Sequence, residues 1–160
     1  MDKIENALYK VLSYICGILI FAMTVLIFSQ VVCRYVMNNS LTWSEELGRY
    51  IFVWITFIGL PVALKAKAHV ALDLLLKKVH GKTYLILLTI NAIFTSILSI
   101  VIFYSGLKLV LLGVGQISSA IQLPMQYVYI VIPFSGLLLL FFTIRVFLEE
   151  RANLLKDEGK

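Results

Sequence analysis

Charged residues are scarce in this sequence. Only 14% of its 160 residues are Asp, Glu, Lys or Arg, whereas 61% are hydrophobic. A soluble domain is about half apolar and about a quarter charged, and the mean hydropathy of +0.95 agrees with this contrast. The composition excludes an ordinary soluble protein and indicates an integral membrane protein. The length suits a single membrane domain over residues 1–160.

Cysteine and histidine are nearly absent, with two of each. Cys16 and Cys33 lie on one apolar run, and their separation along a helix would be roughly 25 Å, far beyond disulfide reach. The spacing of His69 and His80 fits no metal pattern, and no cysteine or carboxylate cluster completes a site. Neither histidine lies in an apolar run, where a haem would need an axial ligand. We therefore expect no metal site and no cofactor.

Ionisable side chains are also missing from the central parts of the long apolar runs. Transporters and proton relays place such groups inside the membrane, because a moving charge needs a partner there. The sequence contains no constellation of nucleophile and base either. We expect no catalytic residues and no transport by this chain alone, so the sequence indicates an accessory or scaffold membrane subunit.

Four apolar runs are long enough to cross about 30 Å of hydrocarbon as helices. They cover residues 11–33, 43–64, 84–107 and 125–147. Membrane-spanning strands would alternate in polarity, which these runs do not. The predicted fold is an all-α integral membrane protein with four transmembrane helices, kinked at Pro61 and Pro133. Residues 70–79 are predicted to form a short interfacial helix on the cytoplasmic surface, with a plain loop as the alternative.

The basic residues lie mostly on one side of the predicted spans. Of the 14 Lys and Arg residues, 11 lie on the side of the two termini and three on the other, namely Arg34, Arg49 and Lys108. Because cytoplasmic segments carry the excess of basic residues, both termini are predicted to be cytoplasmic. The same distribution accounts for the net charge of +5, so this charge does not indicate a nucleic-acid partner.

The segment that joins the first two runs, residues 34–50, concentrates charge and aromatic side chains. Its candidate partner and assembly residues are Arg34, Trp43, Glu45, Glu46 and Arg49. One interpretation is a stabilised helix start: Glu45 and Arg49 pair four residues apart, and Ser44 or Thr42 caps the helix. A second is that the two arginines neutralise the two glutamates across the connection. A third is that the cluster presents charge to a partner protein.

The third run carries a polar stripe formed by Asn91, Thr95 and Ser99, which recur every four residues. Small and hydroxylated side chains at this spacing let helices approach closely and form hydrogen bonds across the contact. The stripe is therefore a candidate assembly site. It predicts either packing within the four-helix unit or a seam for another membrane subunit.

One family resemblance follows from these motifs. Its residues are Arg34-Tyr35, Asn39-Ser40, Trp43-Ser44-Glu45-Glu46-Leu47, Arg49-Tyr50, Phe52-Val53-Trp54 and Gly59, then Ala66-Lys67-Ala68-His69-Val70 and Asp73. With these residues, its length and its four spans, the chain resembles the small membrane subunit (the Q subunit) of the tripartite ATP-independent periplasmic (TRAP) transporters. The motif around residues 43–54 is fairly specific, whereas the third and fourth runs are generic.

The resemblance implies a location, a function and partners. Such systems import organic acids, among them sialic acid and C4-dicarboxylates, across the bacterial inner membrane with a sodium gradient. The implied partners are the large membrane subunit (M), a periplasmic substrate-binding protein (P) and the lipid bilayer. Two alternatives stay open from the residues alone: a membrane anchor of a respiratory or signalling complex without a transport role, and a small self-assembled channel or exporter.

Overall fold

The computed structural model describes residues 2–37, 41–66 and 82–157. Its helices are α1 (Asp2–Tyr35), α2 (Thr42–Lys65), α4 (Lys82–Leu112), α5 (Met125–Tyr129) and α6 (Val131–Asp157). Four helical stretches in this part of the chain are long and apolar enough to cross a membrane. The predicted all-α membrane fold with four spans is therefore confirmed. The predicted interfacial helix at 70–79 lies outside the described residues.

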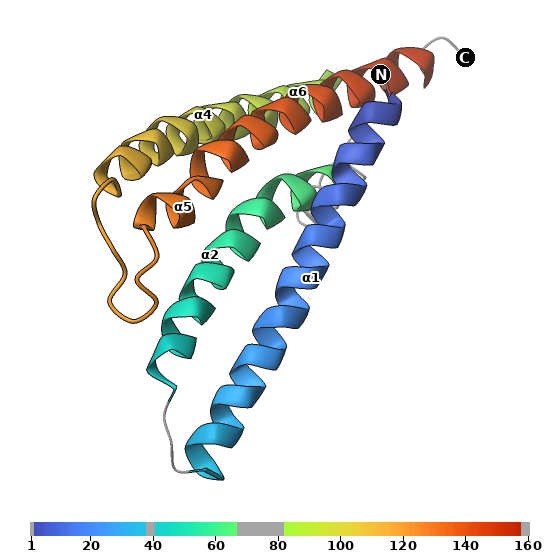
Figure 1. Cartoon of the computed structure of the whole chain (residues 1–160). Coiled ribbons are helices and arrows are strands. Elements are labelled where there is room, and N and C mark those ends of the chain that lie inside the picture. The colour runs from blue at the N-terminus through green and yellow to red at the C-terminus, as the bar shows by residue number, and fades with distance from the viewer. Residues whose placement is uncertain (1, 38–40, 67–81, 158–160) are drawn as a thin grey trace.

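The helices form two antiparallel pairs, α1 with α2 and α4 with α6 (Figure 1). The pairs meet through α2 and α6, so the order across the molecule is α1, α2, α6, α4. Both termini lie at one end, from which the two pairs splay apart (Figure 1). The loop between α4 and α5 runs toward the first turns of α2 and bridges the pairs at the other end.

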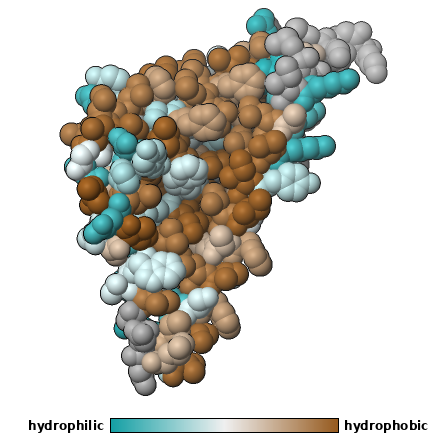
Figure 2. Space-filling model, in the orientation of Figure 1, coloured by the Kyte–Doolittle hydropathy of each residue, from teal (hydrophilic) through white to brown (hydrophobic). Residues whose placement is uncertain are grey.

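α6 is the central helix of this arrangement, because it packs against both α2 and α4. In the stretch Met125–Ala152, which includes α5 and most of α6, half of the apolar part is buried, compared with 6% in α1. The outward faces of α1 and α4 are apolar and exposed; Phe28 and Phe94, for example, are both 69% exposed. Figure 2 shows this apolar surface over most of one face, with hydrophilic residues gathered toward its ends. Such surface requires lipid or an apolar membrane partner.

Pro61 lies inside α2 without ending it. Proline has no N–H, so the carbonyl of Phe57 loses its helical donor. The buried hydroxyl of Ser135 on α6 donates a hydrogen bond to this carbonyl oxygen. An unsatisfied carbonyl in hydrocarbon costs several kcal/mol, so this contact both satisfies the backbone of α2 and joins the two helix pairs.

Pro133 has a different effect on the fourth span. It cannot donate to the carbonyl of Tyr129, four residues earlier, and the helix is interrupted at Ile130, between α5 and α6. The predicted kink thus appears as a break between a one-turn helix and a long one (Figure 1).

The α4–α6 contact depends on two glycines. A Cβ added to Gly136 would lie 2.7 Å from the backbone nitrogen of Phe103 and 2.9 Å from the carbonyl oxygen of Ser99. A Cβ on Gly106 would lie 2.6 Å from the backbone nitrogen of Pro133. The two helix backbones therefore touch directly, as is typical of helix pairs in membranes that use small residues at the crossing.

The link between Pro61 and Ser135 leads to a testable prediction. We expect Ser135→Ala to destabilise the purified chain in detergent by about 1–3 kcal/mol, because it strands the Phe57 carbonyl. In a Pro61→Ala background the backbone regains a donor, so the same substitution is expected to cost much less. Thermal unfolding of the four proteins of this double-mutant cycle measures the difference. Equal losses in both backgrounds would contradict the compensation.

Candidate functional sites

The first site is a clasp at the start of α2, in which Glu46 holds the loop between α4 and α5. Glu46 Oε2 accepts hydrogen bonds from the backbone N–H groups of Ala120 at 2.8 Å and Ile121 at 3.1 Å. Glu46 Oε1 accepts one from the Tyr50 hydroxyl at 2.6 Å. The side chain is largely buried, with 8% exposure for the residue. Its charge is therefore engaged in joining the two helix pairs.

Two backbone N–H groups at the tip of this loop find their acceptor outside the loop. Its two arms are joined by hydrogen bonds from Ser118 N to Leu123 O at 3.0 Å and from Met125 N to Gln116 O at 2.9 Å. At the tip the chain turns through a left-handed residue, Gln122, with φ of 57°. The N–H groups of residues 120 and 121 at this tip both donate to the Glu46 carboxylate. These two backbone donors are thereby satisfied.

The structure corrects the predicted helix start. The residue that precedes α2 is Leu41, and neither Ser44 nor Thr42 caps the helix; Ser44 Oγ instead donates to the carbonyl of Leu41 at 2.7 Å. Serine and threonine hydroxyls can donate as well as accept, and here the Ser44 hydroxyl acts as a donor. The sequence alone does not determine which of these two roles the hydroxyl takes.

The expected pairing of charges in segment 34–50 is also different. Within the described part of the chain, the structure shows no ion pair between Glu45 and Arg49, or between Arg34 and either glutamate. Glu45, Arg49, Arg34 and Trp43 are all exposed. Exposed pairs at this spacing contribute only about 0.2–0.5 kcal/mol, so solvation of the separate charges competes easily. Of the five candidate residues in this segment, Glu46 is the one that the fold places in a fixed contact.

The polar stripe on α4 lies apart from this clasp. Ser99 is fully buried, its hydroxyl donates to the carbonyl of Thr95 at 2.7 Å, and its own carbonyl lies against Gly136 of α6. Asn91 and Thr95 are half-buried. For Ser99, the position favours packing within the four-helix unit over a seam for another subunit.

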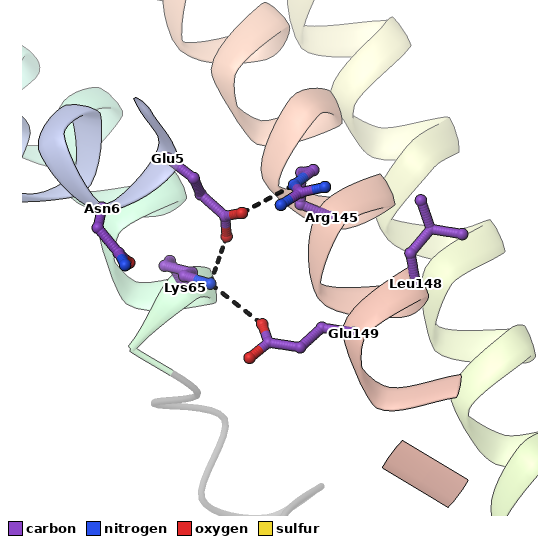
Figure 3. Close-up of a pocket in the computed structure, with 6 residues that line it drawn as sticks. All are labelled: Glu5, Asn6, Lys65, Arg145, Leu148 and Glu149. Atoms are coloured by element: carbon purple, nitrogen blue, oxygen red, sulfur yellow. Dashed lines mark hydrogen bonds and ion pairs between the residues drawn. The ribbon is translucent and has the colours of Figure 1, made fainter. Parts of the chain in front are cut away.

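The second site was not recognised in the sequence. It is an ion-pair network that joins α1, α2 and α6 at the end that carries the termini (Figure 3). Glu5 pairs with both Lys65 and Arg145, with Arg145 Nε 2.7 Å from Glu5 Oε2. Lys65 also lies 3.2 Å from Glu149 Oε2. The Glu5 side chain is 5% exposed, whereas that of Glu149 is 51% exposed.

This network lines a cavity of about 310 Å³ together with Asn6 and Leu148. Its four charged side chains are paired with one another, so none of them is left to bind an ionic ligand. We therefore interpret the ion-pair network as a link between α1, α2 and α6. A signal was present in the sequence: Glu5, Lys65, Arg145 and Glu149 all lie at those ends of their predicted spans that face the side of the two termini.

Among residues 2–37, 41–66 and 82–157, no three His, Cys, Asp or Glu side chains gather at one point. His69 and His80, the two histidines, lie outside these ranges. The two sites described above act by hydrogen bonding and ion pairing, and both connect helices.

Comparison with known proteins agrees with the sequence motifs. Two TRAP transporter small permease proteins of Haemophilus influenzae are 32% and 29% identical over 78 and 128 residues, which are 49% and 80% of this chain and 48% and 78% of theirs. The chain thus spans about half the length of the first. An isethionate TRAP transporter permease, DctMQ of Oleidesulfovibrio alaskensis, is 30% identical over 58% of this chain and 15% of its own.

Further relatives bear names that include sialic acid or C4-dicarboxylate. The family model for the DctQ component of the tripartite ATP-independent periplasmic transporters matches residues 23–153, which is most of the chain. The matched residues include α2 with the Glu46 clasp, the loop it holds and most of α6. Of the second site they include Lys65, Arg145 and Glu149, whereas Glu5 precedes them. The chain therefore belongs to the DctQ component family of TRAP transporters.

Proposed function

We propose that this chain is the accessory membrane subunit of a sodium-coupled, binding-protein-dependent importer of an organic acid. In this role it supports the large transport subunit and binds neither the substrate nor sodium. One observation carries the proposal: the charged side chains that the structure buries, Glu5 and Glu46, are used to connect helices. Among the described residues, no other charged side chain is buried in the spans, where a moving ion would need one.

The large membrane subunit is the proposed principal partner. The name DctMQ of one relative, together with the small share of that protein that this chain covers, supports such a pairing. The exposed apolar faces of α1 and α4 supply ample surface for it within the bilayer. The substrate is left open among organic acids, since the names of the relatives include isethionate, sialic acid and C4-dicarboxylate.

The proposed location is the bacterial inner membrane, with both termini cytoplasmic. The basic residues, 11 on the side of the termini and three on the other, support this orientation. The Glu5–Lys65–Arg145 network would then lie at the cytoplasmic end. The Glu46 clasp and the exposed Arg34 and Arg49 would face the periplasm, where the substrate-binding protein arrives.

A reconstitution experiment tests the role of the chain. We expect it to co-purify with the large subunit, and the pair to support sodium-dependent uptake when the binding protein is added. The chain alone in vesicles is expected to give no flux. Flux from the chain alone would indicate the channel alternative, and co-purification with a redox enzyme instead would indicate the anchor.

Alanine substitutions at Glu45, Glu46 and Arg49 test which step these residues serve. We expect Glu46→Ala and Arg49→Ala to lower complex yield or docking of the binding protein, while the affinities for substrate and sodium stay unchanged. Glu45→Ala is expected to have the smallest effect, because its side chain is exposed and unpaired in the described structure. Normal assembly and docking together with an altered substrate or sodium affinity would refute the accessory role.

A further inference from the structure

A second cavity, of about 510 Å³, lies beside the Glu46 clasp. It is formed by the first turns of α2 and by the loop after α4, and its lining residues are Glu46, Arg49, Tyr50, Gln116, Ile117, Ser118, Ser119 and Met125. No residue of the exposed apolar faces of α1 and α4 takes part. The cavity is therefore a feature of the loop end of the molecule and not of its lipid-facing surface.

The walls of this cavity are held in place without any ligand. One wall is α2, and the other is the loop whose tip is fixed by the two hydrogen bonds to Glu46 Oε2. Tyr50 ties the two together, because its hydroxyl bonds to Glu46 and also contacts the sulfur of Met125 at 3.4 Å. A preformed surface of this kind avoids the entropy cost of ordering a loop when a partner binds.

Arg49 is the charged group in the cavity that forms no ion pair within the described residues. Glu46 is engaged by three donors, and within the described residues Arg49 has no carboxylate within 4 Å. The side chains of Gln116 and Ser119 line the same cavity and offer further N–H and O–H donors. A guanidinium beside neutral donors is suited to a carboxylate, which it can bind through two parallel hydrogen bonds.

The surroundings favour a protein as the source of that carboxylate. Ile117, which lines the cavity together with Arg49, is 66% exposed, and the lining also includes Tyr50 and Met125. Arginine, tyrosine and methionine are enriched in protein–protein interfaces.

We propose that this cavity receives an Asp or Glu side chain of the periplasmic substrate-binding protein, with Arg49 as its ion-pair partner and Glu46 as the residue that positions the loop wall. This inference rests on the proposed function and on its orientation. It assigns the docking contact on this chain to the guanidinium group of Arg49.

The test uses the complex of this chain with the large membrane subunit in lipid nanodiscs, and measures the affinity of the binding protein at low and high salt. We expect Arg49→Glu to weaken binding about tenfold or more and to reduce its salt dependence. Arg49→Lys is expected to be intermediate, because it keeps the charge and loses the planar fork. The matched control is Arg34→Glu, an exposed arginine that does not line the cavity, and it should bind normally.

Glu46→Gln tests the positioning role separately. It should weaken binding while the salt dependence carried by Arg49 remains, and faster amide exchange at residues 120 and 121 should accompany the loss. If the wild-type complex binds no binding protein, the proposed function is wrong and this inference falls with it. If the wild type binds and Arg49→Glu binds equally well, or if Arg49→Glu instead prevents assembly with the large subunit, this inference alone is wrong.

Discussion

Glu5→Ala is expected to destabilise the chain more than any other single change of a charged residue. It removes the carboxylate shared by Lys65 and Arg145 and thereby the link between α1, α2 and α6. Breaking a buried ion pair by removing one partner costs about 3–5 kcal/mol. We expect the lower end of this range, since Lys65 keeps its contact with Glu149. Thermal unfolding of the purified chain in detergent measures the effect.

Glu149→Gln is the matched control for this prediction. It also removes a carboxylate from Lys65, but the Glu149 side chain is 51% exposed. Exposed ion pairs contribute about 0–1 kcal/mol, so the control should be nearly neutral. Glu5→Gln, which keeps volume and some hydrogen bonding, should fall between the two. If Glu5→Ala and Glu149→Gln lower the unfolding temperature equally, the buried position of Glu5 has no energetic importance.

Gly136→Ala is expected to have the largest effect among substitutions that change no charge. The new methyl group would overlap the backbone of α4 at Phe103 and Ser99, and backbone atoms cannot turn aside as a flexible side chain can. Overpacking of this kind costs about 1–3 kcal/mol. Because α4 packs chiefly on α6, we also expect a lower yield of folded chain. Unfolding temperature and yield after purification measure both.

Gly59→Ala and Gly17→Ala are the controls for Gly136→Ala. Both glycines lie in membrane-spanning helices, and no neighbouring atom lies within 4 Å of the Cβ that each substitution adds. Alanine has the higher helix propensity, by about 1 kcal/mol, so these variants should be as stable as the wild type or more so. A Gly136→Ala protein as stable as the Gly59→Ala protein would show that the α4–α6 contact can relax at little cost.

The four spans were predictable because hydropathy is a one-dimensional property of the chain. A run of apolar residues of sufficient length has to cross the bilayer as a helix, whatever it packs against. The sequence predicted a kink at Pro61 and at Pro133, because a missing N–H has a local effect on the carbonyl four residues earlier. The structure has an interruption at Ile130 in the fourth span, whereas α2 continues through Pro61. The donor to the Phe57 carbonyl, Ser135, comes from 78 residues further along the chain and was not foreseeable.

The different roles of the adjacent residues Glu45 and Glu46, in contrast, could not be predicted from the sequence. Glu45 and Glu46 have the same chemistry and neighbouring positions, yet the helix turns them to different faces. Glu46 faces the loop after α4 and becomes the clasp, whereas Glu45 faces solvent. The register of α2 against that loop depends on how α2 packs on α6, which no local pattern encodes. The same holds for Ser99, whose stripe predicted a contact without naming the helix that would make it.

Hydropathy and local motifs were thus enough to place the chain in a membrane, to count its spans and to point to its family. Three-dimensional packing alone selected the residues that connect those spans. Glu5 meets Arg145 across 140 positions of sequence, and Glu46 meets Ala120 across 74. The physical reason is that burial in lipid is a property of each segment, whereas an ion pair or hydrogen bond between segments depends on the distance and register that the whole fold imposes.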